Sequence, residues 1–234
     1  MQTEYKTLIS NSSLEILEVN NLSHVFPMHI NRRICIGRID SGTKVLFIDG
    51  KKIELKKDDL FIVPPYKVHM SYVDEASYSI ICADDINQLY EGTNFDKKFH
   101  KAFKNGNFRS LISYYLKQSK YSYKKKYSKI DEILKYIDNN YTKQLTVDLL
   151  AHNIGLSPHY LLHLFKEVVG LSLHQYILQS RVKKFKERGM QQKDKMDVAF
   201  SCGFYDQSHL IRIFKKHVGI TPNRYFDSVR MIKA

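Results

Sequence analysis

The sequence predicts an α+β protein of two domains, a small N-terminal β-barrel followed by an all-α domain built from two helix-turn-helix units. The first observation is an internal repeat, since residues 165–170 (FKEVVG) return 49 positions later as residues 214–219 (FKKHVG). The second is a series of short β-rich runs between residues 32 and 73. We therefore expect a barrel domain over 1–93, a helical segment with a basic linker over 94–127, and a helix-turn-helix domain over 128–234.

The repeat extends well beyond the two six-residue segments. Leu161 matches Leu210 at the same offset, and Gly155 matches Gly203 at an offset of 48. Each copy reads as a helix that ends near a glycine, a short turn, a second helix, another glycine and a third helix. This order is typical of a helix-turn-helix unit, here present twice.

Capping residues predict where the helices begin. Ser157-Pro158 and Thr221-Pro222 each place a hydroxyl before a proline, which is tolerated at the first helical position. Ser172 is expected to cap a helix that Gly189 ends. Another helix is expected to start at Ser128, with one apolar face formed by Ile130, Ile133, Leu134 and Ile137.

The positive charge of the chain is concentrated in its second part. Of the net charge of +13, residues 1–95 contribute −3 and residues 96–234 contribute +16. Such a surplus on a helix-turn-helix domain favours neutralisation of nucleic-acid phosphates. A lysine-rich composition can also come from an AT-rich genome, but the acidic first part argues against that as the whole explanation.

The second copy carries a motif that resembles a known family. Residues 203–215 (GFYDQSHLIRIFK) and 219–225 (GITPNRY) resemble the second helix-turn-helix signature of AraC/XylS-type transcription regulators, and the first copy resembles their first unit from Gly155 onward. The resemblance covers about 128–234. It departs at residues 189–196, which leaves the start of the next helix open.

The resemblance implies that the second helix of each unit enters a DNA major groove. It places the DNA-contacting positions on His159, Leu162, His163, Lys166, Gln207, Ser208, His209, Arg212 and Lys215. Arg212 suits guanine and Gln207 suits adenine, whereas Leu162 can pack only on a thymine methyl group or a sugar. The alternative is that His159, His163 and Arg212 are ordinary exposed surface residues that do not contact DNA.

The N-terminal part is rich in predicted strands. They cover 34–39, 44–48, 51–55, 60–63 and 69–73, and Asp49-Gly50 is a strong hairpin signal between two of them. Phe26-Pro27-Met28-His29 and Pro64-Pro65-x-x-x-His69 resemble the cupin sensor domain that precedes such DNA-binding domains. This likeness spans about 20–75.

A cupin resemblance raises the alternative of a metal-dependent enzyme. Catalytic cupins bind metal through His-x-His, a Glu and a later His, but here Asn31 replaces the second His and no Glu follows at the usual distance. His29 and His69 alone, beside Arg32 and Arg33, make a poor cation site. We therefore expect no metal, no cofactor and no catalysis.

Sensing of a small molecule is the favoured use of the barrel. Candidate residues for an anionic or hydroxylated ligand are His29, Arg38, Tyr66 and His69. The alternative is a barrel that serves only dimerisation or protein contact. Residues 94–116, with Phe95, Phe99 and Phe103 at helical spacing, are predicted to form a helix that mediates a homodimer or packs on its own barrel.

Three scattered cysteines predict the redox state and the compartment. Cys35, Cys82 and Cys202 are expected to be reduced thiols in the cytoplasm, and neither a signal peptide nor a membrane span is expected. The predicted function is that of a transcription regulator whose partners are double-stranded DNA, a small effector and, for an activator, RNA polymerase. The sequence leaves open whether it is an activator or a repressor. Non-specific DNA packaging is disfavoured because the two recognition helices differ.

Overall fold

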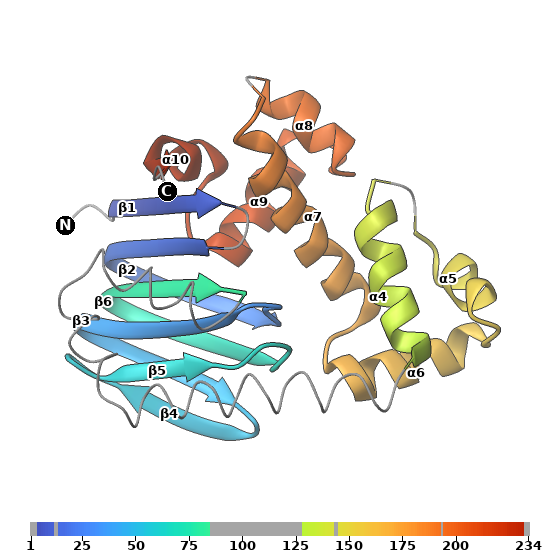
Figure 1. The fold of residues 1–234 in the computed structure, drawn as a ribbon, viewed down its shortest axis with the longest axis horizontal. Coiled ribbons are helices and arrows are strands. Elements are labelled where there is room, and N and C mark those ends of the chain that lie inside the picture. The colour runs from blue at the N-terminus through green and yellow to red at the C-terminus, as the bar shows by residue number, and fades with distance from the viewer. Residues whose placement is uncertain (1–3, 12–13, 85–127, 143–144, 193, 232–234) are drawn as a thin grey trace. The chain divides into compact units, whose positions relative to one another are not determined.

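The computed structural model describes residues 4–11, 14–84, 128–142, 145–192 and 194–231 (Figure 1). The chain forms two compact units, one of residues 1–122 with 223–234 and one of residues 123–222. The predicted helical segment 94–116 and the linker 120–127 lie outside the described residues. The last twelve residues, assigned from the sequence to the helical domain, group with the sheet.

The first unit is a seven-stranded sheet. Its strands are β1 (Glu4–Asn11), β2 (Leu14–His29), β3 (Ile34–Ile48), β4 (Lys51–Leu55), β5 (Leu60–Val63), β6 (His69–Ala83) and β7 (Val229–Met231). Their order is β4-β3-β6-β2-β1-β7, and β5 pairs with β3 beside β4. The long central strands β2, β3 and β6 are therefore covered by neighbours along most of their length.

One core joins the two halves of β3. Cys35 and Ile39 in its first half and Leu46 in its second half belong to the same buried cluster, so one face of the bent sheet encloses an apolar interior. Alternation decides which side chains enter it. His69, Ser71 and Val73 of β6 are buried, whereas Tyr72 between them is exposed.

The predicted bounds of β4 and β5 are confirmed, but β3 joins two predicted strands and β6 is longer than predicted. The gap between the predicted strands 34–39 and 44–48 contains Gly42. In the structure Gly42 occupies an irregularity inside β3 with φ of 71°. A Cβ there would lie 2.5 Å from the carbonyl oxygen of Glu75, so glycine lets the strand continue past its neighbour. Strands β1 and β2 were not predicted.

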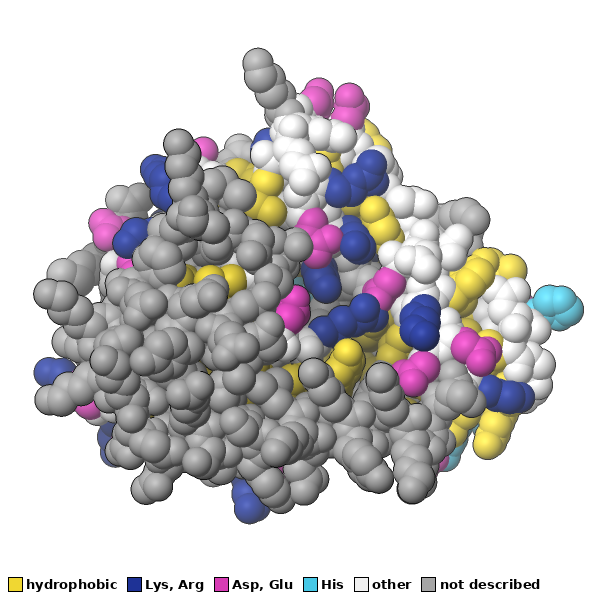
Figure 2. Space-filling model, in the orientation of Figure 1, with side chains coloured by type: hydrophobic (Ala, Val, Ile, Leu, Met, Phe, Trp, Pro, Cys, Tyr) yellow, Lys and Arg dark blue, Asp and Glu magenta, His cyan; other side chains and the backbone are white. Residues whose placement is uncertain are grey.

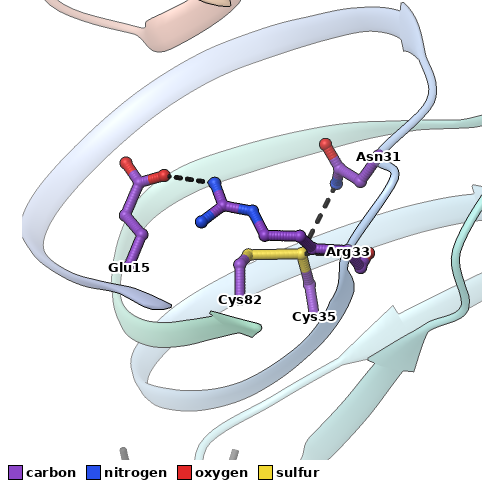
Figure 3. The surroundings of a disulfide bond; sticks show 5 residues. All are labelled: Glu15, Asn31, Arg33, Cys35 and Cys82. Atoms are coloured by element: carbon purple, nitrogen blue, oxygen red, sulfur yellow. Dashed lines mark hydrogen bonds and ion pairs between the residues drawn. A yellow bond between two sulfur atoms is a disulfide. The ribbon is translucent and has the colours of Figure 1, made fainter. Parts of the chain in front are cut away.

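The expectation of three reduced thiols is wrong for two of them. Cys35 and Cys82 form a disulfide between β3 and β6 (Figure 3). The two residues are direct register partners with Cα atoms 4.2 Å apart, a pairing that their sequence separation of 47 residues conceals. Beside them Arg33 forms an ion pair with Glu15 at 2.8 Å. Cys202 is a free, buried thiol.

The end of the chain completes the edge of the sheet. Strand β7 pairs in parallel with β1, in the register Thr7 with Val229. The preceding helix α10 (Pro222–Ser228) supplies a side-chain contact at the same edge, since the hydroxyls of Thr7 and Ser228 lie 3.3 Å apart. The two ends of the described chain therefore belong to one unit.

The second unit consists of helices. They are α4 (Ser128–Asn140), α5 (Val147–Asn153), α6 (Pro158–Val169), α7 (Leu173–Gly189), α8 (Lys195–Ser201) and α9 (Gln207–Val218). As predicted, α4 buries Ile130, Ile133, Leu134 and Ile137. No helix in the described part of the chain is long and apolar enough to cross a membrane.

Helix α7 ends one residue later than its sequence predicts. Gly189 is still helical and buried, and Met190 is the C-terminal cap with right-handed backbone angles. The next helix begins only after Asp194, whose side chain accepts hydrogen bonds from the backbone of Met196 and Asp197. This cap settles the helix start that the departure from the family pattern had left open.

Candidate DNA-binding surface and sheet interior

The first helix-turn-helix unit is formed by α5 and α6. The hydroxyls of Thr146 and Ser157 accept backbone hydrogen bonds at the start of the two helices, and Pro158 occupies the first turn of α6. Gly155 in the turn has φ of 63°, a conformation that strains other residues. The packed face of α6 buries Leu161, Phe165 and Val169.

The second unit is formed by α8 and α9 in the same way. Asp206 caps α9 by accepting from the backbone of His209 at 2.7 Å. Gly203 in the turn has φ of 84°, and a Cβ there would lie 2.8 Å from Nε of Arg181 on α7. The backbone conformation therefore favours glycine, and any other residue would also displace the Arg181 guanidinium. The packed face of α9 buries Leu210, Ile213 and Phe214.

The outward face of α9 carries a row of polar and cationic side chains. Those of Gln207, Ser208, Arg212 and Lys215 are all exposed, as predicted from their positions. Over its length α9 carries Arg212, Lys215 and Lys216 and no acidic residue. On the face in Figure 2, by contrast, Lys and Arg are interspersed with Asp and Glu over the described helices.

The outward face of α6 is weaker in charge. His159, Leu162, His163 and Lys166 are exposed, Leu162 to 44%. Glu167 lies 3.9 Å from His163, and it balances the single cation of the helix, Lys166. Tyr160, which the sequence did not single out, is 52% exposed. The surface of α6 is therefore more apolar than that of α9.

His209 differs from the other predicted DNA-contacting residues because it is half-buried. Its ring packs against Phe204 and Tyr205, at centroid distances of 5.7 Å and 5.1 Å, and its Nδ1 accepts from the backbone of Tyr205. Burial, together with the charge of Arg212, lowers the pKa of His209. The neutral ring supports the turn, whereas Tyr205 beside it is 76% exposed.

Helix α7 packs against both helix-turn-helix units. Near its start, Tyr176 packs against Phe165 of α6 at 5.8 Å, and nine residues later Phe185 packs against Phe214 of α9 at 5.7 Å. A capping box between Ser172 and Gln175 fixes the start of α7. Because one rigid helix carries both contacts, the spacing of the recognition helices is set within this unit.

Polar contacts join α7 to α4 and to Tyr141, which follows α4 and precedes the first helix-turn-helix unit. The Ser180 hydroxyl donates to Asp138 at 3.1 Å, and Nε of Arg181 donates to the carbonyl of Tyr141 at 3.1 Å. Arg188 donates to the Tyr141 hydroxyl at 3.3 Å. These contacts join α4 to the connecting helix, so α4 is part of the same folded unit.

The sheet interior brings His29 and His69 together. They are register partners on β2 and β6, and their ring centroids are 4.0 Å apart. Each Nδ1 lies against a carbonyl oxygen two residues before it, that of Pro27 at 2.8 Å and that of Lys67 at 2.9 Å. Burial lowers the pKa of both rings, that of His69 to about 3. Both histidines are therefore neutral near pH 7.

The other two predicted ligand residues are Arg38 and Tyr66. Arg38 is buried in an ion pair with Asp40 at 2.6 Å. It pairs in register with Ser79, ten residues along β6 from His69. Tyr66 lies in the turn before β6 with φ of 62°, and its backbone donates to the carbonyl of Asn31. Arg38 is thus not placed at the histidine pair.

A residue absent from the sequence-based prediction lies beside the histidines. Lys44 on β3 is only 4% exposed, and its ammonium donates to the Ser71 hydroxyl at 3.0 Å. In the predicted strand 44–48, both the odd-numbered and the even-numbered positions contain apolar residues. The alternation of side chains along the strand therefore could not show that Lys44 points inward. Burial lowers the pKa of Lys44 to about 7. Within the described part of the chain, no group of three or more His, Cys, Asp or Glu residues could hold a metal.

Two family models match this chain. Residues 150–228 match a helix-turn-helix domain, and residues 11–80 match the AraC-like ligand binding domain. The matched ranges run from within α5 past α9 and include most of the sheet with its histidine pair.

Curated relatives match less than half of the chain. The chain is 35% identical over 103 residues to the bifunctional transcriptional activator/DNA repair enzyme AdaA of Bacillus subtilis, covering 44% of this chain and 49% of that protein. It is 30% identical over 98 residues to the melibiose operon regulatory protein of Escherichia coli, covering 41% and 32%. The chain thus spans half or less of the length of these relatives.

The whole fold has a counterpart among solved structures. An apo variant of ToxT from Vibrio cholerae covers 95% of this chain and 100% of its own, with a TM-score of 0.64 and 11% identity. At this identity the likeness concerns the fold: a sheet domain followed by helix-turn-helix units.

Proposed function

We propose that this chain, a helix-turn-helix protein of the AraC family with an AraC-like ligand-binding domain, is a sequence-specific transcription regulator controlled by a small molecule. The observation that carries this proposal is the outward face of α9. Its exposed Gln207, Ser208, Arg212 and Lys215 project from a helix with three Lys or Arg residues and no acid. Such a surface matches a phosphate-lined groove with readable base edges.

Within this proposal the exposed residues have different tasks. Arg212 has the guanidinium geometry for a bidentate contact to guanine, and Gln207 has the amide geometry for adenine. Lys215 and Lys216 at the end of α9 neutralise phosphates, which orients the helix without reading sequence. On α6, Leu162 supplies an apolar contact, while His159, His163 and Lys166 supply polar ones. His209 positions the turn and the exposed Tyr205.

The spacing of the two helices supports binding to one face of the duplex. Helix α7 has 17 residues, so it is about 25 Å long, while successive major grooves on one face lie about 34 Å apart. The recognition helices packed on Tyr176 and Phe185 can therefore reach neighbouring grooves. Each chain then reads two short segments separated by about one helical turn of DNA.

We further propose that the sheet domain binds the effector at the histidine end of its interior. Relatives described as activators, among them AarP of Providencia stuartii, support an activating role that involves RNA polymerase. Homodimer formation through residues 94–116 and a cytoplasmic location belong to the same proposal. AdaA is described as bifunctional, but the match covers only 49% of that protein.

Selection from a random duplex library tests the function directly. The full chain should enrich a motif with two conserved segments about ten base pairs apart, and a footprint upstream of its own gene should protect the same motif. Repeating the footprint with cell extract tests for the effector. If no motif is enriched and the chain binds all duplexes with equal affinity, the proposal of a sequence-specific regulator is contradicted.

A further inference from the structure

Lys44 lies inside the sheet domain, with no carboxylate partner among the residues that the structure describes. Its ammonium is surrounded by the rings of Tyr78, Phe26 and Phe61, at 4.8 Å, 5.4 Å and 5.5 Å from their centroids. The Ser71 hydroxyl is its hydrogen-bond partner, and no acidic side chain among the described residues forms an ion pair with it. An ammonium has three N–H donors, so this buried group retains unused donor capacity.

Burial of a cation without a counter-ion is costly. An isolated ammonium in an apolar interior loses its hydration, and contacts with aromatic rings offset only part of that cost. Core packing alone would be served better by an apolar side chain of similar size. The arrangement is therefore suited to an anion that arrives with the ligand.

The neighbouring histidines limit the charge and add a second feature. Since a carbonyl oxygen can only accept, Nδ1 of His29 and Nδ1 of His69 must donate to Pro27 and Lys67. In the neutral rings Nε2 is then an acceptor on each. The group thus offers one positive charge and two acceptors, which fits a singly charged anion that also carries a hydroxyl.

Of the three side chains, that of His29 lies nearest the surface, while those of Lys44 and His69 are buried. His29 and Phe26 are half-buried rather than buried, and Met28 between them on β2 is exposed to 45%. A ligand that enters beside them would meet the histidines first and Lys44 deeper in the sheet. The surrounding rings favour an apolar or aromatic body.

We propose that Lys44, His29 and His69 form the recognition site for a hydroxylated monocarboxylate, with the carboxylate on Lys44 and the hydroxyl on the histidines. This rests on the proposed function, because it names the class of effector for the same domain. The carboxylate accepts a charge-assisted hydrogen bond from the ammonium. Binding involves no covalent step.

Thermal unfolding of the full chain with four probes tests the site without knowing the natural ligand. The probes are 4-hydroxybenzoate and lactate, each paired with its uncharged amide, over a stepwise series of concentrations. At least one acid should raise the melting temperature in a saturable manner, since a ligand of the folded state stabilises it, while its amide should not. No shift with either acid, or equal shifts with the amides, would overturn the proposal.

Two lysine variants separate binding from folding. Lys44→Met should fold with a melting temperature equal to or above that of the parent and lose roughly tenfold or more in affinity for the acid, measured by calorimetry. Lys52→Met, an exposed position on β4 of the same sheet, should leave affinity unchanged. An unaltered affinity in Lys44→Met contradicts the assignment.

A histidine variant tests the second half of the site. His69→Phe should weaken 4-hydroxybenzoate more than benzoate, because only the former can donate a hydroxyl to Nε2. Equal losses for both would overturn the role of the histidines. DNA binding by the unliganded chain is measured separately, so failure of this site is distinguishable from failure of the proposed regulator.

Discussion

The ring of Phe185 lies 5.7 Å from that of Phe214, at an interplanar angle of 85°. Phe185 belongs to the connecting helix α7, and Phe214 belongs to the recognition helix α9. Both side chains are completely buried. This edge-to-face pair fixes the second recognition helix on the element that also carries the first.

Replacing Phe185 by Ala should destabilise the helical unit by about 3–5 kcal/mol, because the ring is lost and a cavity remains between α7 and α9. Urea unfolding followed by circular dichroism measures the change. Phe200→Ala is the matched control, since Phe200 on α8 is 51% exposed and should cost little. A loss below about 1 kcal/mol in Phe185→Ala would contradict its central place in the core.

Replacing Arg212 by Ala should weaken binding to the selected motif by about 1–3 kcal/mol and relax preference at one base pair. Lys215→Ala is the control on the same helix. It should weaken selected and scrambled duplexes alike and reduce the salt slope by about one. Anisotropy titrations on both duplexes make the comparison. If Arg212→Ala also weakens both duplexes equally, Arg212 is a phosphate contact.

A fragment of residues 128–234 should bind DNA by itself, because it contains both helix-turn-helix units and most of the positive charge. Its affinity should fall steeply with salt, since several phosphates lose their counterions on binding. The fragment lacks β1, so strand β7 loses its pairing partner. Helices α4–α9 are all present and keep their contacts with one another. A folded fragment that shows no salt-dependent binding would argue against the DNA-binding assignment.

Reduction of the Cys35–Cys82 bridge should lower the free energy of unfolding of the sheet domain by about 2–4 kcal/mol, since the bridge restricts the unfolded chain. Unfolding with and without dithiothreitol measures the difference. The denatured, unreduced protein should titrate one thiol, Cys202, of its three cysteines. Cys202→Ser should keep the reductant effect. Three free thiols before reduction would show that the bridge is absent in solution.

Lys44 should make the stability of the unliganded sheet domain depend on pH. Its pKa of about 7 in the folded chain lies below its ordinary value of 10.5, so the unfolded chain holds more protons between these values. Stability should therefore rise as pH increases from about 7 towards 10. Lys44→Met should flatten this rise in urea titrations, and Lys52→Met should not. An unchanged slope in Lys44→Met would mean that the buried amine keeps its ordinary pKa.

Several features of this protein follow from the local sequence alone. Ser157 before Pro158 places the start of α6, and the glycines of the two turns adopt the left-handed angles that their positions require. The hairpin at Asp49-Gly50 separates β3 from β4 at the predicted residues. Such signals are readable because capping and turn conformation depend on atoms only a few residues apart.

The helix-turn-helix faces were also predictable, since burial of Phe165 and Phe214 at helical spacing leaves opposite positions exposed. His209 is the exception among them. Its ring packs against Phe204 and Tyr205 because of the way the turn folds back. The helical spacing of residues in the sequence does not predict this contact.

The tertiary structure alone decided the sheet interior. The disulfide between Cys35 and Cys82, the meeting of His29 with His69 and the inward direction of Lys44 all depend on the register of β3, β6 and β2. A shift of one residue in that register would turn each of these side chains to the other face. Register is set by pairing between strands that are far apart in the chain. The sequence by itself therefore determined most of the helices and strands and the exposed helical surface. Which side chains meet inside the sheet was decided by how the strands pair.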